Sequence, residues 1–274
     1  MGENAGQGQN LLTRLSSRML KRNYAAGWWK DDTIYDCAAR HAASVPDRTA
    51  IRDSFCALTY AELVSLADRT AATLRERGLR PGDRVGAWMS SRVELAVILL
   101  ACSRGGFVLC PSLHRNHTVV EIAALLDRCS AKALFAEVGY GADADRKDIF
   151  AAVGERQSAP AAFPIGPPVK RSPDDIASQL GLSPQGQVSA SHGLADDIVY
   201  LAFTSGTTGE PKGVMHSNNT LLSNARSLAE DWAFSEQSVT FTLSPLSHNL
   251  GFGALVLTMH AGGEIVLNDL PRGA

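Results

Sequence analysis

The sequence lacks the features that mark membrane proteins, disulfide scaffolds and zinc proteins. Its longest uninterrupted apolar run, 95–102, has eight residues, whereas a membrane-spanning helix needs about 20. Five cysteines are present and no two of them form a Cys-X-X-Cys pair. This pattern disfavours a zinc site, and we interpret the cysteines as reduced, mostly buried thiols of a cytoplasmic protein.

An excess of charge of one sign is also missing. The chain has 26 Lys and Arg against 28 Asp and Glu, a formal charge of −2 over 274 residues. This balance gives no electrostatic footprint for nucleic acid or for an anionic membrane. With 45% hydrophobic and 20% charged residues, the composition is typical of a soluble globular protein with one large domain or two small ones.

The N-terminal arm, residues 1–29, gives two interpretations. Residues 11–22 carry four basic and no acidic side chains, with apolar residues near helical spacing. This pattern fits a presequence-like amphipathic helix. Glu3 and the Gly/Asn-rich start weaken that signal, so we favour a solvated arm.

Helix-like and strand-like segments alternate through the next part of the chain. The spacing of apolar residues predicts helices over 61–77, 93–103 and 119–129, and strands over 84–89, 107–110 and 131–136. This alternation predicts an α/β fold with a largely parallel sheet. Prolines then punctuate 158–191, which we predict to be an irregular linker between a first α/β subdomain, 30–157, and the start of a second, 192–274.

A segment of small polar residues and glycines follows the apolar run 198–203. Glycines let backbone N–H groups turn toward a ligand, hydroxyls add donors, and a lysine adds positive charge, so the segment suits a polyphosphate. The surrounding pattern predicts strand, phosphate-binding loop and helix; the alternative is an ordinary surface loop. The candidate phosphate-binding residues are Thr204, Ser205, Gly206, Thr207, Thr208, Gly209 and Lys212.

The spacing of this segment differs from that of the common nucleoside triphosphatase loop. That loop needs a glycine, four residues, and then Gly-Lys-Ser/Thr. Here Gly206 and Gly209 lie too close together, and Lys212 is followed by Gly213. A Ras-like or ATPase interpretation is therefore disfavoured.

Segment 204–214, Thr-Ser-Gly-Thr-Thr-Gly-Glu-Pro-Lys-Gly-Val, resembles the signature of the adenylate-forming superfamily, the AMP-dependent synthetases and ligases. Segments 58–63, 78–85 and 244–251 are similar to further landmarks of that family in the same order. The likeness covers about 28–267. It implies the N-terminal part of the family's large domain, with βαβ-type sheets flanked by helices.

The resemblance implies an ATP-dependent ligase that joins an acid to a thiol. A carboxylate attacks the α-phosphate of ATP to give an acyl-adenylate and pyrophosphate, and the thiol of coenzyme A then takes the acyl group. Implied cofactors are ATP, Mg²⁺ and coenzyme A. By resemblance, Thr204 lies near the metal, while Thr207, Thr208 and Lys212 contact the β- and γ-phosphates; Lys212 is the first catalytic candidate.

The second catalytic candidate is His248. By resemblance, its Pro-Leu-X-His segment borders the acyl pocket and the thiol channel; a surface or capping histidine is the alternative. Ser247 stands where the family usually has an aromatic residue, a change that widens or polarises the site. The predicted substrate pocket comprises His248, Asn249, Leu250 and Phe252.

The superfamily has more chain after its phosphate loop than this sequence, in which 62 residues (274 − 212) follow Lys212. Further segments complete the adenine, metal and ribose sites, and a small C-terminal domain carries a catalytic lysine. We therefore expect an N-terminal portion, incomplete at its C-terminus, with weak triphosphate binding and little activity alone. Its expected partners are the missing C-terminal part as a separate chain, or a second copy.

Three functions stay open at this point. The favoured one is an acyl-CoA ligase. The second is an adenylation module that loads a carrier protein. The third is a truncated, non-catalytic nucleotide-binding or interaction module.

Overall fold

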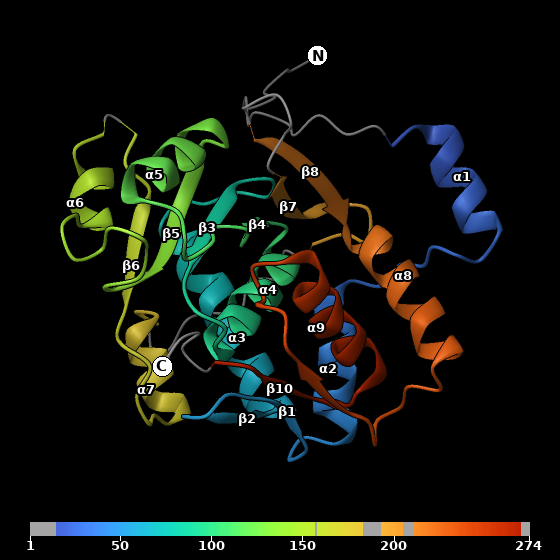
Figure 1. Ribbon diagram of the computed structural model, residues 1–274. Helices are drawn as coiled ribbons and strands as arrows, with labels where there is room; N and C mark the ends of the chain where they lie inside the picture. The colour runs from blue at the N-terminus through green and yellow to red at the C-terminus, as the bar shows by residue number, and fades with distance from the viewer. Residues whose placement is uncertain (1–14, 157, 183–192, 205–210, 270–274) are drawn as a thin grey trace.

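The computed structural model describes residues 15–156, 158–182, 193–204 and 211–269. Two sheets with a layer of helices between them make up the fold (Figure 1). The larger sheet has the order β6-β5-β3-β4-β7-β8, and all its neighbours are parallel except β7 and β8. Its strands are β3 (Arg84–Trp88), β4 (Val108–Cys110), β5 (Ala131–Glu137), β6 (Ala161–Ile165), β7 (Ile198–Thr204) and β8 (Lys212–Ser217).

The smaller sheet has the order β2-β1-β10-β9. Strand β1 pairs antiparallel with β2 and parallel with β10, and β10 pairs parallel with β9. Because β1 and β10 are distant in sequence, this sheet joins an early and a late part of the described chain. Its strands are β1 (Thr49–Arg52), β2 (Ala57–Thr59), β9 (Val239–Thr242) and β10 (Glu264–Leu267).

Helices cover both faces of the larger sheet. Helices α2, α3, α4 and α9 lie between the two sheets in Figure 1, and residues of all four belong to the main hydrophobic core. Helices α5 and α6 pack on the other face, where a second core includes Trp88 and Leu134. The described helices are α1 (Ser17–Ala25), α2 (Ile34–Ser44), α3 (Tyr60–Glu76), α4 (Val93–Gly105), α5 (Val119–Arg128), α6 (Ile149–Gly154), α7 (Pro173–Gln179), α8 (Asn218–Asp231) and α9 (Asn249–Ala261).

Local sequence accounts for the ends of these helices. Thr59 begins α3 with a capping box to Glu62, and Thr118 begins α5 in the same way with Glu121. Gly106 ends α4 at φ 71°, in the left-handed region where glycine avoids Cβ strain. The predicted α/β fold with a largely parallel sheet is confirmed, and the helices and strands predicted over 61–136 lie within about two residues of their observed ends.

The segment 158–191 differs from the irregular linker that its composition predicted. Strand β6 lies within it and pairs with β5, and helix α7 follows. Pro164 is tolerated because β6 is an edge strand, and Pro173 begins α7 behind the Ser172 cap. Both sheets combine strands from 30–157 and from 192–274; the division at the linker stays a prediction.

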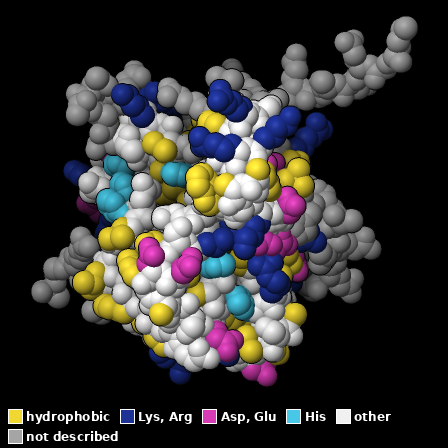
Figure 2. All heavy atoms as spheres, turned by 90° about the vertical axis from the view of Figure 1, so that its right-hand side faces the viewer, with side chains coloured by type: hydrophobic (Ala, Val, Ile, Leu, Met, Phe, Trp, Pro, Cys, Tyr) yellow, Lys and Arg dark blue, Asp and Glu magenta, His cyan; other side chains and the backbone are white. Residues whose placement is uncertain are grey.

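Surface and cysteine features complete the fold. All five cysteines are buried and free of disulfides, which confirms the predicted buried thiols. Figure 2 shows the side of the molecule that carries α1 and α8, where basic side chains gather above a mixture of acidic and apolar ones. Helix α1 exposes Arg18, Lys21 and Arg22 on its surface. Among the described helices, none combines the length and apolarity needed to cross a membrane.

Candidate active site

A cavity of about 1140 Å³ opens where strands of both sheets end. The larger sheet contributes Ser90 after β3, Glu137 at the end of β5 and Thr204 at the end of β7. The smaller sheet contributes Leu243 after β9 and Asp269 after β10. Open α/β sheets bind ligands at the carboxyl ends of their strands, and this cavity is large enough for a cofactor-sized molecule.

The predicted phosphate-binding segment connects the two strands of a hairpin, which differs from the predicted strand, loop and helix. Strand β8 begins at Lys212 and pairs antiparallel with β7 before α8 begins at Asn218. The N-terminus of α8 is capped by Ser217, whose side chain accepts a hydrogen bond from Thr220 N–H. The N-terminus of α8 is therefore separated from Thr204 and Lys212 by the length of β8.

The two ends of the hairpin connection lie side by side. Thr204 pairs with Lys212 in the ladder, and Thr204 Oγ1 donates to Lys212 O at 3.4 Å. Both side chains are exposed, and Thr204 and Pro211 line the cavity. The other predicted phosphate ligands, Ser205, Gly206, Thr207, Thr208 and Gly209, lie outside the described residues.

His248 lines the cavity together with two other histidines. Its ring is stacked on that of His114, with centroids 4.5 Å apart and planes 21° apart, and His117 lies 5.5 Å from His114. Burial, followed by the charges of His248 and His117, lowers the pKa of His114 to about 4. At neutral pH the His114 ring is therefore uncharged.

The four predicted pocket residues have different environments. Within the part of the chain that the structure describes, His248 lines the cavity and the other three do not. Asn249 Oδ1 accepts a hydrogen bond from Tyr200 OH at 2.5 Å. Leu250 is 75% exposed, whereas Phe252 is 1% exposed and stacks on Tyr200 in the core. Sequence proximity to His248 does not distinguish these positions, because successive helical residues point in different directions.

Several cavity residues were missed by reasoning from sequence. Ser90, Glu137 and His114 line the cavity, and each follows or ends a strand that the sequence predicted correctly. That position was the available signal, because parallel strands bring their carboxyl ends to one edge of a sheet. The order of the strands, which brings these loops together, is not encoded in local periodicity.

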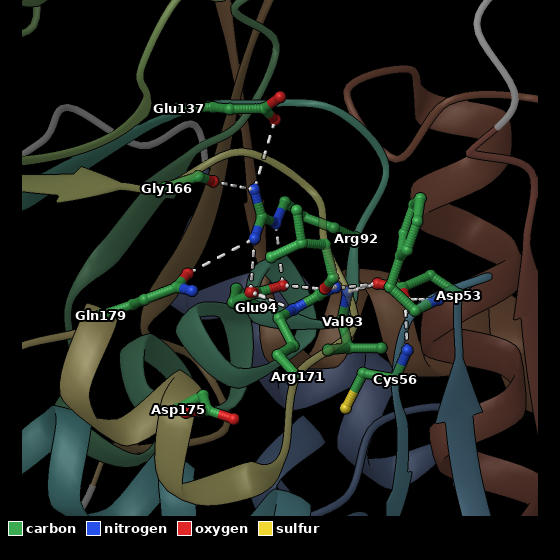
Figure 3. Close-up of polar contacts among 12 residues, drawn as sticks. Asp53, Cys56, Arg92, Val93, Glu94, Glu137, Gly166, Arg171, Asp175 and Gln179 are labelled. Carbon is green, nitrogen blue, oxygen red and sulfur yellow. Dashed lines mark hydrogen bonds and ion pairs between the residues drawn. The ribbon is translucent and has the colours of Figure 1, made fainter.

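A buried ionic cluster contacts Glu137, one of the residues that line the cavity (Figure 3). Arg92 and Arg171 both pair with Glu94, at 2.7 and 2.8 Å, and Arg171 also pairs with Asp53. The side chains of Arg92, Glu94 and Arg171 are at most 1% exposed. Burial would raise the pKa of Glu94, but hydrogen bonds and charges from both arginines hold that pKa below its usual range.

Glu137 connects this cluster to the cavity. Its Oε2 accepts hydrogen bonds from Ser90 N–H at 2.9 Å and from Ser90 Oγ at 2.5 Å, and it lies 3.6 Å from Arg92 Nη1. Figure 3 shows the Glu137 carboxylate facing the guanidinium of Arg92. The carboxylate is thus occupied in holding the turn between β3 and α4.

The described residues do not form a preassembled metal centre. No group of three or more His, Cys, Asp or Glu side chains among them could hold a metal ion. Mg²⁺ usually takes one or two protein ligands and fills its other positions with phosphate oxygens and water. A single exposed hydroxyl such as that of Thr204 fits an ion of this kind.

A large cavity at the carboxyl ends of the strands, with Thr204 and Pro211 in its lining, lies where α/β folds bind ligands. Comparison with protein families makes this specific. The profile of the AMP-binding enzyme family matches residues 38–272. The chain therefore belongs to this family, and its relatives and structural neighbours are adenylate-forming enzymes.

Curated relatives include both ligases and synthases. The chain is 30% identical to the medium-chain fatty-acid–CoA ligase of Escherichia coli K12 over 82% of its own length and 40% of the relative's. It is 26% identical to enterobactin synthase component E of the same organism, over 93% of its length and 47% of the relative's. The chain thus spans less than half the length of these two relatives.

Solved structures of adenylate-forming enzymes have the same fold as this chain. The apo structure of Mycobacterium smegmatis MbtA superposes with a TM-score of 0.77 at 26% identity, over 94% of this chain and 48% of that one. Apo MatB from Rhodopseudomonas palustris superposes with a TM-score of 0.71 at 29% identity, over 88% and 46%. The fold is therefore that of the N-terminal part of adenylate-forming enzymes.

Proposed function

We propose that the protein takes part in the ATP-dependent activation of a carboxylic acid to an acyl-adenylate, followed by transfer of the acyl group to coenzyme A. One observation carries the proposal: Thr204, at the end of the predicted phosphate-binding hairpin, and His248, the predicted acyl-pocket residue, line the same cavity. A reaction between ATP and a carboxylate requires that the two substrates bind next to each other in one site.

The residues of the hairpin would act mainly through charge and position. Lys212 lies across the ladder from Thr204, and its ammonium group would contact the phosphates of ATP bound next to Thr204. Positive charge stabilises the leaving pyrophosphate, and catalysis of such reactions depends mainly on positioning and electrostatics. Thr204 would hold Mg²⁺, which neutralises phosphate charge when bound.

The test measures ATP binding and the first chemical step separately. Titration calorimetry of the chain with ATP and Mg²⁺ is expected to give weak binding that Lys212→Ala weakens by about 10-fold, while Lys132→Ala, an exposed lysine on β5, leaves it unchanged. ATP–pyrophosphate exchange across a panel of carboxylic acids is expected to be slow in the chain alone. Absence of any ATP binding would contradict the proposal.

A carrier protein is the second candidate for the acyl acceptor. Relatives of this chain include enterobactin synthase component E and, at 32% identity over 86% of the chain, malformin synthetase mlfA of Aspergillus brasiliensis. Supplying coenzyme A or a phosphopantetheinylated carrier protein to the adenylating protein distinguishes the two. Thioester on coenzyme A alone supports the first candidate, and acylated carrier alone supports the second.

A further inference from the structure

We propose that Ser91 and Ser247 are positioning residues that fix the His248 ring at the cavity. The inference rests on the proposed function, because it assigns a role to His248 in that site. The loop that precedes His248 joins β9 to α9, and side chains from two loops of the larger sheet hold it. Each contact joins segments more than 130 residues apart in sequence.

The first contact comes from the turn between β3 and α4. The backbone N–H of Leu246 donates to Ser91 Oγ at 3.1 Å, and the Leu246 side chain is fully buried. The neighbouring Ser90 is held by Glu137 through its N–H and its hydroxyl. Glu137 in turn faces Arg92 of the buried cluster. Ser91 is therefore presented to Leu246 from a turn that is itself fixed.

The second contact comes from the loop after β4. Ser247 is 7% exposed, and its Oγ lies 3.1 Å from His114 Nδ1. The backbone of His114 is fixed as well, because its carbonyl accepts a hydrogen bond from Trp88 Nε1 at 3.1 Å. A hydroxyl on this nitrogen sets the orientation of the His114 ring, and that ring covers one face of His248. A phenylalanine at position 247 has no polar atom with which to make this bond.

Hydrogen bonds fix the backbone at His248, so its side chain is the part that can still rotate. His248 N–H donates to Pro245 O, and Phe252 N–H donates to His248 O, both at 2.9 Å. A Cβ at Gly251 would lie 2.3 Å from Pro245 O, so only glycine allows the loop to pack this closely on the first turn of α9. The described structure shows no cap bond from the imidazole to the helix. Rotation of the His248 side chain is thus restrained mainly by stacking of its ring on His114.

The two serines should affect His248 by different routes. Ser91→Ala leaves the buried Leu246 N–H without its acceptor and shifts the loop. Ser247→Ala keeps the Ser91 contact to the loop but releases the His114 ring, so the stack opens. Small displacements of a group that faces a reacting ligand lower reaction rates strongly, so both changes should reach chemistry through His248.

The decisive experiment observes the histidines directly and needs neither ligand nor turnover. Imidazole ¹H–¹⁵N NMR spectra of the full chain labelled at histidine are compared for the wild type and four variants. Ser247→Ala is expected to shift the His114 and His248 signals and to leave His41 and His260 in place. Ser91→Ala is expected to shift or broaden the His248 signal. Ser247→Thr, which keeps the hydroxyl, should restore the wild-type spectrum.

Ser227→Ala is the matched control, because Ser227 is exposed on α8 and its hydroxyl donates a hydrogen bond to Ser223 O of the same helix. It should leave all histidine signals unchanged. Unchanged His248 signals in both Ser91→Ala and Ser247→Ala would overturn the proposal. A change in His248 that Ser247→Thr does not reverse would also overturn the role of the Ser247 hydroxyl.

Exchange kinetics separate this inference from the proposed function. In protein that catalyses ATP–pyrophosphate exchange, Ser247→Ala is expected to lower kcat by about tenfold with little change in KM for ATP, and Ser247→Thr to recover most of the loss. Absence of both ATP binding and exchange in the wild type would count against the proposed function. The NMR spectra would still decide whether the serines position His248.

Discussion

The buried ionic cluster and the β7–β8 hairpin are both rich in polar groups, but they differ in how those groups are used. In the cluster, Arg92, Glu94 and Arg171 are almost fully buried and satisfy one another. At the hairpin, Thr204 and Lys212 are exposed, and their ladder contact leaves the ammonium group outside the hydrogen bond. A charge that is paired inside the fold supports structure, whereas an exposed one such as Lys212 is accessible to a ligand.

The largest expected effect breaks the buried side of this comparison. Glu94→Gln leaves two buried guanidiniums facing a neutral amide, and we expect the free energy of unfolding to fall by about 3–5 kcal/mol. Asp145→Asn removes a carboxylate whose partner is Arg146, in a pair that is more than 70% exposed, and should cost less than about 1 kcal/mol. Urea denaturation measures both. If Glu94→Gln cost as little unfolding free energy as Asp145→Asn, the cluster would contribute no more to stability than an exposed ion pair.

The next effect compares two predicted pocket residues of helix α9, of which one is buried in the core and the other is exposed. Phe252→Ala removes a ring that stacks on Tyr200 at 4.0 Å in the core, and should cost about 3 kcal/mol of unfolding free energy. Leu250→Ala removes a side chain that is 75% exposed, and should change it by less than about 0.5 kcal/mol. Thermal and urea unfolding of the pair provide the check. A large loss for Leu250→Ala would place that residue in a packed environment.

The sequence predicts the fold well where structure is encoded locally. Helix α4 was recognisable from its apolar run and from Gly105-Gly106 at its end, and α3 from its periodicity. Strand β8 was missed because Lys-Gly-Val-Met-His carries no clear strand pattern. Its pairing with β7 supplies what the pattern lacks, since strand stability depends on neighbours more than on propensity.

The site was predictable in part for the same reason. The hairpin segment and His248 were found because each belongs to a continuous run of residues that resembles a family motif. Ser91 and His114 lie in loops after β3 and β4, and Glu137 ends β5, so only the order of strands in the larger sheet brings the three to one cavity. Non-local arrangement of this kind has no local signal.

A third prediction concerns His114, which is half-buried and lines the cavity. The pKa of His114 is lowered to about 4 from its ordinary value of 6.5, so between these values the unfolded chain binds more protons than the folded one. Unfolding free energy should therefore decrease as pH falls from about 6.5 to about 4.

His114→Asn should remove on the order of 1–2 kcal/mol of that decrease, after allowance for partial exposure. His41→Asn, which alters a histidine on α2 outside the cavity, should retain it. Urea unfolding at a series of pH values measures the slopes. An unchanged slope in His114→Asn would contradict the lowered pKa.

The smallest effect on stability is expected at the β7–β8 hairpin, and it tests most directly whether the hairpin differs from the buried ionic cluster. Because Lys212 is exposed, Lys212→Ala should change unfolding free energy by less than about 0.5 kcal/mol in the absence of ligand. With ATP and Mg²⁺ present, the wild type should gain stability in proportion to the logarithm of ligand concentration over Kd, and Lys212→Ala should gain less at every concentration. Lys132→Ala should follow the wild type under both conditions. If Lys212→Ala destabilised the ligand-free chain as much as Glu94→Gln does, the exposed lysine would belong with the structural charges, and the distinction between the two regions would fail.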